Sequence, residues 1–185
     1  MTDLGLLKQF LGLEIVKYEE GIKVIQQKYT VKLLIKFKMA ECKESKCLFL
    51  SGIKLGEVGD SPLVDISLYR QLVRSLLYLT YSSPDLAYVV GVVSIYMHQS
   101  HEICCKESKS ILQYVQGTRN FGVHYGASSQ LELVGFTDSD WVGDPIDKNS
   151  TLDCVFMLAH GPICCSSNKK YTISLSSIEA ECRGA

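Results

Sequence analysis

The stretch from Leu133 to Asp144 constrains the fold most, because an apolar strand pattern runs directly into closely spaced carboxylates. An ionised carboxylate in an apolar interior must be paired or bound to a cation, so the pattern predicts a buried strand that ends where the acids begin. Side chains two residues apart on a strand share a face, which makes Asp138 and Asp140 a like-charge pair. A divalent cation would relieve their repulsion. The alternative is a polar strand end that leads into a surface loop.

Two β-rich runs near the N-terminus, residues 11–16 and 21–26, are joined by a polar segment and predict a hairpin. Before them, the apolar spacing of residues 4–10 predicts a short helix or the end of one. After them, Thr30 is suited to cap a helix in which apolar positions alternate with lysines. These lysines are either solvated or directed at a nucleic acid: Lys32, Lys36 and Lys38.

The middle of the chain has helical periodicity, whereas the last third has strand periodicity. Residues 68–80 predict an amphipathic helix, and a nearly all-apolar helix begins near Pro84-Asp85. A third helix, 101–116, is expected to end at Gly117. The strands that follow predict an antiparallel meander: residues 121–125, 131–139, 153–159, 163–167 and 171–175. A capping box at residues 176–179 opens a last helix, and the expected fold class is α+β.

Composition limits the class of protein. A chain of 185 residues with 46% hydrophobic and 21% charged residues is globular rather than disordered. The net charge of −1 gives no global attraction for nucleic acid, although residues 1–50 hold nine lysines against six acids. The N-terminus lacks the basic region of a signal peptide, and the uncharged stretch 86–99 is too short to span a bilayer. We therefore expect an intracellular protein, cytoplasmic or nuclear.

The eight cysteines do not match a metal-binding pattern. The spacing of Cys42 and Cys47 differs from the C-x2-C pattern of zinc sites, and so do the two adjacent Cys-Cys pairs. Because nothing in the sequence indicates export, disulfides are not expected either. We predict buried thiols.

A second acid, Glu181, is placed to join Asp138. Three antiparallel strands followed by a helix bring an acid on the first strand and an acid in the first helical turns to one point. Hydrolysis of a phosphodiester with two metal ions needs several carboxylates, so these two alone are too few. The alternatives are an exposed helical acid for Glu181 and a capping role for Glu179.

Five motifs follow one another along the chain in a specific order. They are MTDLGLLKQFLGLE at residues 1–14, YRQLVRSLLYLT at 69–80 followed by Pro84-Asp85, ILQYVQGT at 111–118, GFTDSDW at 135–141 and LSSIEAE at 175–181. Together they resemble the Ty1/copia-type retrotransposon Pol polyprotein, and the resemblance covers essentially the whole chain.

The resemblance implies three units. Residues 1–60 would be the end of the reverse-transcriptase palm, with a hairpin, a helix and a linker. Residues 61–118 would be a helical unit like the thumb and connection, and residues 119–185 a truncated ribonuclease H-like domain. The expected architecture is thus a palm-end hairpin and a small helical unit followed by an incomplete ribonuclease H-like meander.

The resemblance also implies roles for individual residues. The hairpin would grip a primer strand through Phe10, Leu11, Gly12 and Leu13. Asp138 and Glu181 would be remnant catalytic residues that bind Mg²⁺ or Mn²⁺, with Asp140 as the fallback ligand on the strand. The implied partner is a nucleic acid, either an RNA/DNA hybrid or a primer-template, and no membrane is implied.

Departures from the family pattern bear on catalysis. The paired aspartates of the polymerase site would lie upstream of Met1, and the remaining ribonuclease H acids beyond Ala185. Cys164-Cys165 replaces a Trp-containing motif, which removes a large buried surface.

The expected function is a polyprotein fragment without catalysis of its own. The alternatives are a ribonuclease H completed by another chain and a residual nucleic-acid-binding module. For the last third we expect exposed apolar surface, open sheet edges and poor solubility.

Overall fold

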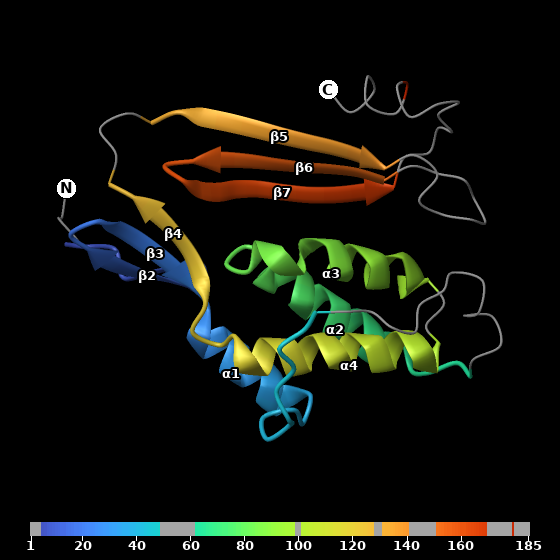
Figure 1. Ribbon diagram of the computed structural model, residues 1–185. Coiled ribbons are helices and arrows are strands. Elements are labelled where there is room, and N and C mark those ends of the chain that lie inside the picture. Colours follow the sequence, from blue (N-terminus) through green and yellow to red (C-terminus); the bar gives the residue numbers. More distant parts are fainter. Residues whose placement is uncertain are drawn as a thin grey trace.

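The computed structural model describes residues 5–48, 62–98, 101–127, 131–140, 151–169 and 179. Within these residues the fold is α+β, with two antiparallel sheets and four α-helices (Figure 1). The predicted fold class is therefore confirmed. The three-stranded sheet lies over helix α3, and the four-stranded sheet lies where α1 begins (Figure 1).

The first sheet has the strand order β1-β2-β3-β4. Its strands are β1 (Gln9–Phe10), β2 (Leu13–Tyr18), β3 (Gly21–Ile25) and β4 (Gly122–Gly126). The predicted hairpin is confirmed as β2 and β3, with Glu14 opposite Ile25 and Tyr18 opposite Gly21. The prediction of a helix over residues 4–10 is wrong, because Gln9 and Phe10 pair with β2 as a strand.

Strand β4 does not belong to the predicted meander. It pairs with β3, about 100 residues earlier in the chain, with Val123 opposite Val24. Strand β4 follows helix α4 in the chain and pairs with the edge of β3 that β2 does not occupy. Val123 is buried in this position. The predicted limits of the three units, 1–60, 61–118 and 119–185, stay a prediction. The β3–β4 pairing connects the first unit to the third.

The helices begin and end close to the predicted positions. Their bounds are α1 (Gln27–Lys36), α2 (Ile66–Leu79), α3 (Ala87–Ser94) and α4 (Glu102–Gly117). Two 3-10 turns flank α3: η2 (Pro84–Leu86) and η3 (Ile95–Met97). Asp65 caps α2, because its side chain accepts hydrogen bonds from the backbone N–H groups of Ser67 and Leu68.

Two helix ends differ from prediction. Thr30 is not the cap of α1: it lies inside that helix and is buried, and Gln26 is the capping residue. Gly117 is the last residue of α4 rather than the residue beyond it, and the capping position belongs to Thr118.

The core lies among the four helices. The side chains buried there are Leu33, Leu34, Tyr69, Leu72, Val73, Leu76, Leu79, Leu86, Val89, Val90, Val93, Cys104, Ile111, Leu112 and Val115. The predicted burial of the apolar helix is confirmed, since α3 contributes three of its valines. Tyr69 donates a hydrogen bond to the Val93 carbonyl at 2.6 Å, and burial raises the pKa of Tyr69 above its ordinary value. In the described part of the chain, no helix has the length and apolar character needed to cross a membrane.

The second sheet has the order β5-β6-β7, with β5 (Leu133–Asp140), β6 (Thr151–Leu158) and β7 (Gly161–Lys169). It is joined to the first sheet where the Tyr125 hydroxyl donates a hydrogen bond to the Pro162 carbonyl at 2.8 Å. Strand β7 lies nearest to α3, and β5 lies farthest from it (Figure 1). The predicted strand 171–175 lies outside the described residues.

Strand β5 is not buried, contrary to the prediction. Its apolar side chains are exposed, and Phe136 keeps 57% of its surface accessible. The reason is its position: β5 is an edge strand, and among the described residues no strand pairs with its outer side. Within the described residues, this part of the chain therefore has the exposed apolar surface and the open sheet edge that the sequence predicts.

Candidate nucleic-acid interface

The tip of the β1–β2 hairpin is a tight turn in an uncommon backbone conformation. Leu11 and Gly12, which form the turn, have φ angles of 47° and 83°. Positive φ at both central residues is the signature of the type I′ turn, which matches the twist of a two-residue hairpin. Phe10 and Leu11 are exposed at this tip.

Helix α2 contacts the tip through Tyr78. The Tyr78 hydroxyl donates a hydrogen bond to the Leu11 backbone carbonyl. A Cβ atom at Gly12 would lie 2.5 Å from the same hydroxyl oxygen, so this position requires glycine for space as well as for its φ angle. The Tyr29 ring packs edge-on against Tyr78 at 4.7 Å between centroids, and Tyr81 packs against it at 6.0 Å.

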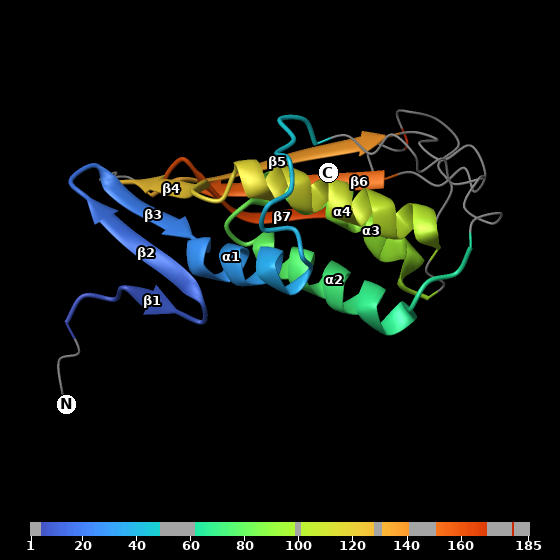
Figure 2. The same cartoon turned by 90° about the horizontal axis from the view of Figure 1, so that it is seen from below.

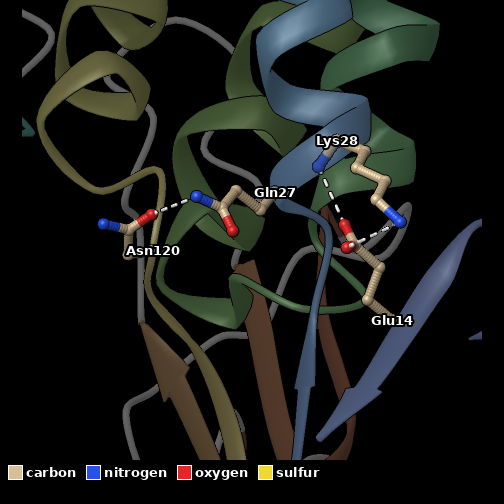
Figure 3. Close-up of polar contacts among 4 residues, drawn as sticks. All are labelled: Glu14, Gln27, Lys28 and Asn120. Carbon is tan, nitrogen blue, oxygen red and sulfur yellow. Dashed lines mark hydrogen bonds and ion pairs between the residues drawn. The ribbon is translucent and has the colours of Figure 1, made fainter. Parts of the chain in front are cut away.

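Glu14 ties the hairpin to the first turn of α1 (Figure 3). One carboxylate oxygen accepts a hydrogen bond from the Lys28 backbone N–H at 2.8 Å, and the other lies 3.7 Å from the Lys28 ammonium. A carboxylate at a helix N-terminus satisfies a free N–H group and interacts favourably with the helix dipole. On the other side of this turn, the Gln27 amide donates a hydrogen bond to Asn120 at 2.8 Å (Figure 3). Figure 2 shows β2 and the start of α1 side by side.

Three exposed lysines follow one another at four-residue intervals on α1, and we call them the lysine row: Lys28, Lys32 and Lys36. Residues four apart lie on the same face of a helix, so the ammonium groups form a single line. Like charges at this spacing destabilise a helix by about 0.2–0.5 kcal/mol per pair. The Lys28 ammonium already lies near the Glu14 carboxylate, so Lys32 and Lys36 form the pair whose repulsion an anion would remove.

Lys28 was absent from the lysines predicted for this face. The prediction started the helix at Thr30, which left Lys28 outside it, although its spacing from Lys32 was visible in the sequence. Lys38 lies beyond the end of α1 and has a φ of 58°, so it does not continue the row.

The acidic residues form a different arrangement from the predicted one. Asp138 on β5 lies directly opposite Asp153 on β6, and opposed residues of an antiparallel pair share a face of the sheet. One carboxylate oxygen of Asp153 is buried and has no hydrogen-bond partner within the part of the chain that the structure describes. The backbone of Asp140 lies opposite Thr151, while its side chain and the whole of Glu181 are outside the described residues. The predicted meeting of Asp138 and Glu181 therefore stays a prediction.

Comparison with known proteins identifies the family. The chain is 35% identical over 177 residues to the retrovirus-related Pol polyproteins from transposons RE2 and RE1 of Arabidopsis thaliana. The alignments cover 96% of this chain. The chain belongs to the Ty1/copia-type retrotransposon Pol polyproteins. It spans only 12% of the length of the RE2 and RE1 polyproteins, and so corresponds to one region of Pol.

A shorter relative matches this Pol region along most of its own length. An uncharacterized mitochondrial protein of Arabidopsis thaliana is 33% identical over 184 residues, which is 99% of this chain and 76% of that protein. No protein-family model matches the chain, and no solved structure matches it significantly.

The metal ion implied by the resemblance fits the described residues only in part. Asp138 and Asp153 supply carboxylate oxygens, the ligand type that Mg²⁺ prefers, and one oxygen of Asp153 has no hydrogen-bond partner among the described residues. The described part of the chain contains no group of three or more His, Cys, Asp or Glu side chains that could hold a metal. We therefore derive no catalytic step from this pair.

Asp153 is the acid that sequence reasoning missed. The sequence placed it at the start of the predicted strand 153–159 and assigned it no role in the site. What the sequence did not show is the register, which places Asp153 rather than Leu152 or Cys154 opposite Asp138.

The cysteines are less buried than predicted. All seven in the described residues are free thiols, but only Cys104 is fully buried, and Cys47 and Cys164 are exposed. Burial raises the pKa of the Cys104 thiol, which favours its neutral form.

Proposed function

We propose that this Pol region holds a nucleic-acid duplex and has no catalysis of its own. In this proposal residues 1–60 are the end of the reverse-transcriptase palm, residues 61–118 the thumb and connection, and residues 119–185 the beginning of ribonuclease H. The observation that carries the proposal is the lysine row on α1, tied through Glu14 to the β1–β2 hairpin.

The dimensions of the lysine row suit a nucleic-acid backbone. Four residues of helix rise about 6 Å, so the three ammonium groups cover about 12 Å. One strand of a duplex carries a phosphate about every 3.4 Å of helix axis, and the row therefore spans three to four phosphates, by that rough measure. Tyr78 contacts the hairpin tip and packs on Tyr29 of the same helix α1. The tip places Phe10 and Leu11 at the surface, where the resemblance expects the primer strand.

Salt dependence provides the test. Binding of a fluorescent RNA/DNA primer-template duplex is measured by anisotropy from low to physiological salt. Three phosphate contacts predict that log K falls with log salt at a slope of about −3, and each lysine replaced by glutamine is expected to reduce that slope by about 1. Undetectable binding, or binding that does not depend on salt, would contradict the proposal.

A matched pair of variants distinguishes the effect of the lysine row on binding from the effect of the net charge of the chain. Lys32→Gln/Lys36→Gln removes two positive charges from the row. Lys106→Gln/Lys109→Gln removes the same charge from exposed positions on α4. The proposal requires weaker binding and a shallower slope for the first variant only, and an equal loss in both would contradict it.

A second function, metal-dependent ribonuclease H activity, is favoured by the Asp138–Asp153 pair. It requires metal ions held by Asp138, Asp140 and Glu181, or a site completed by another chain. When bound, Mg²⁺ would activate water and stabilise charge on the scissile phosphate. Cleavage of an RNA/DNA hybrid in Mg²⁺, compared with Asp138→Asn, tests it. Cleavage above the variant would overturn the non-catalytic proposal, and no difference would exclude this activity for the isolated chain.

A further inference from the structure

The hairpin tip needs an external contact to keep its conformation. Leu11 occupies the left-handed region, which disfavours side chains with a Cβ atom, whereas the preferred sequences for this turn begin with Asn, Asp or Gly. Strand β1 has only two residues and lies at the edge of the first sheet, so pairing with β2 alone gives it few backbone hydrogen bonds. Leu11 is 77% exposed, so packing of its side chain does not hold the turn.

Tyr78 supplies that contact. Its hydroxyl donates a hydrogen bond to the Leu11 carbonyl, and the same hydroxyl oxygen lies close to Gly12. Tyr78 itself is well held, because the flanking α2 residues Leu76 and Leu79 are buried in the core and Tyr29 packs on its ring. The tip is thus fixed to the helical core by a residue 67 positions away in the sequence.

We propose that Tyr78 is a positioning residue, which holds the Leu11-Gly12 tip in the conformation that binds nucleic acid. This inference rests on the proposed function of the hairpin. Without the hydroxyl, the tip populates other conformations, and the apparent affinity falls in proportion to the fraction of molecules that keep the binding conformation. The lysine row is unchanged, so the salt dependence of binding stays the same.

The test uses Tyr78→Phe in the full chain, which keeps the aromatic packing and removes the hydroxyl. Tyr81→Phe is the matched control, because Tyr81 belongs to the same aromatic cluster and is exposed. Two quantities are measured: the Kd for the primer-template duplex with its salt slope, and hydrogen exchange of the backbone amides of residues 10–13.

We expect Tyr78→Phe to raise the Kd by roughly three- to tenfold, the effect of losing one hydrogen bond, with an unchanged salt slope and faster exchange at the tip. Tyr81→Phe should change neither quantity. Faster exchange with an unchanged Kd would overturn the inference and leave the proposed function standing. A raised Kd with unchanged exchange would also overturn it, because the hydroxyl would then contact the nucleic acid directly. Absence of binding by the unmodified chain would overturn the proposed function together with the inference.

Discussion

Asp138 and Asp153 occupy directly opposed positions of the β5–β6 pair, and their side chains leave the sheet on the same face. Like charges at directly opposed positions destabilise a sheet, and one oxygen of Asp153 is in addition buried without a hydrogen bond. The pair is therefore expected to cost stability in the absence of a divalent cation.

Asp153→Asn is expected to stabilise the chain in the absence of divalent cations, by about 1 kcal/mol, because it removes the repulsion. Mg²⁺ should raise the thermal midpoint of the unmodified chain and have less effect on the variant. Thermal unfolding with EDTA and with Mg²⁺ checks both statements. Glu19→Gln, at an exposed acid of the β2–β3 turn, is the control. A midpoint of Asp153→Asn equal to or below that of the unmodified chain in EDTA would contradict the prediction.

Local patterns in the sequence were sufficient for helices α2 and α4. The predicted 68–80 and 101–116 correspond to Ile66–Leu79 and Glu102–Gly117, because helix periodicity depends on residues three and four apart. The strands of the second sheet were also found at nearly their correct positions, through alternation and turn residues.

Contacts between distant parts of the chain were not predictable in the same way. Strand β4 pairs with β3, about 100 residues earlier in the chain, and the local sequence of β4 does not indicate which strand it pairs with. The start of α1 depends on Glu14, which satisfies the Lys28 N–H from another element, so local capping preferences favoured Thr30 instead. The same limit applies to the candidate site. The contact between Tyr78 and the Leu11-Gly12 tip joins residues that are 67 positions apart, so the local sequence around neither of them predicts it.

Leu11→Asn is expected to stabilise the hairpin. Asparagine tolerates the left-handed conformation better than leucine, and Asn-Gly is the preferred sequence of the type I′ turn. Since the leucine side chain is exposed, little packing is lost, and the free energy of unfolding should rise by about 0.5–1 kcal/mol. Urea denaturation measures this change. Leu7→Asn, at another exposed leucine before β1, serves as the comparison. A destabilised Leu11→Asn variant would show that the turn relies on the leucine side chain.

Tyr114 is expected to make stability depend on alkaline pH. Its hydroxyl donates a hydrogen bond to the Asp85 carboxylate at 2.6 Å, and this bond, with burial, raises the pKa of Tyr114 from 10.0 to about 12. Because the folded pKa lies above the unfolded one, the contribution is complete below about pH 10 and is lost as the pH rises through about 12.

The measurement compares Tyr114→Phe with the unmodified chain by urea denaturation from pH 8 to 12. At pH 8 the variant should be less stable by about 1 kcal/mol, the typical value for one hydrogen bond. The difference should shrink toward zero by pH 12. Tyr88→Phe, at an exposed tyrosine of α3, should match the unmodified chain throughout. A difference that stays constant with pH would show that the Asp85 bond does not set the pKa.

Glu107 is a buried acid in α4, with 4% of its surface exposed and one carboxylate oxygen that has no hydrogen-bond partner among the described residues. Burying such a group without a partner costs about 1–3 kcal/mol. Glu107→Met keeps a similar volume and is expected to raise the free energy of unfolding within that range. Glu102→Met, at an exposed acid of the same helix, should have no such effect. Destabilisation by Glu107→Met would indicate that the carboxylate binds a group that the described residues do not contain.

Phe136 is expected to limit the solubility of the chain. It lies on β5, whose outer edge carries no strand among the described residues, and neighbouring apolar side chains of the same strand are exposed as well. An exposed apolar edge strand pairs readily with another chain, and a lysine on such a strand prevents that pairing. Phe136→Lys should therefore reduce concentration-dependent light scattering and raise the soluble fraction. Phe121→Lys is the matched control, since Phe121 is 63% exposed but lies outside the second sheet, between α4 and β4. Equal improvement in both variants would mean that general hydrophobicity, rather than the β5 edge, causes association.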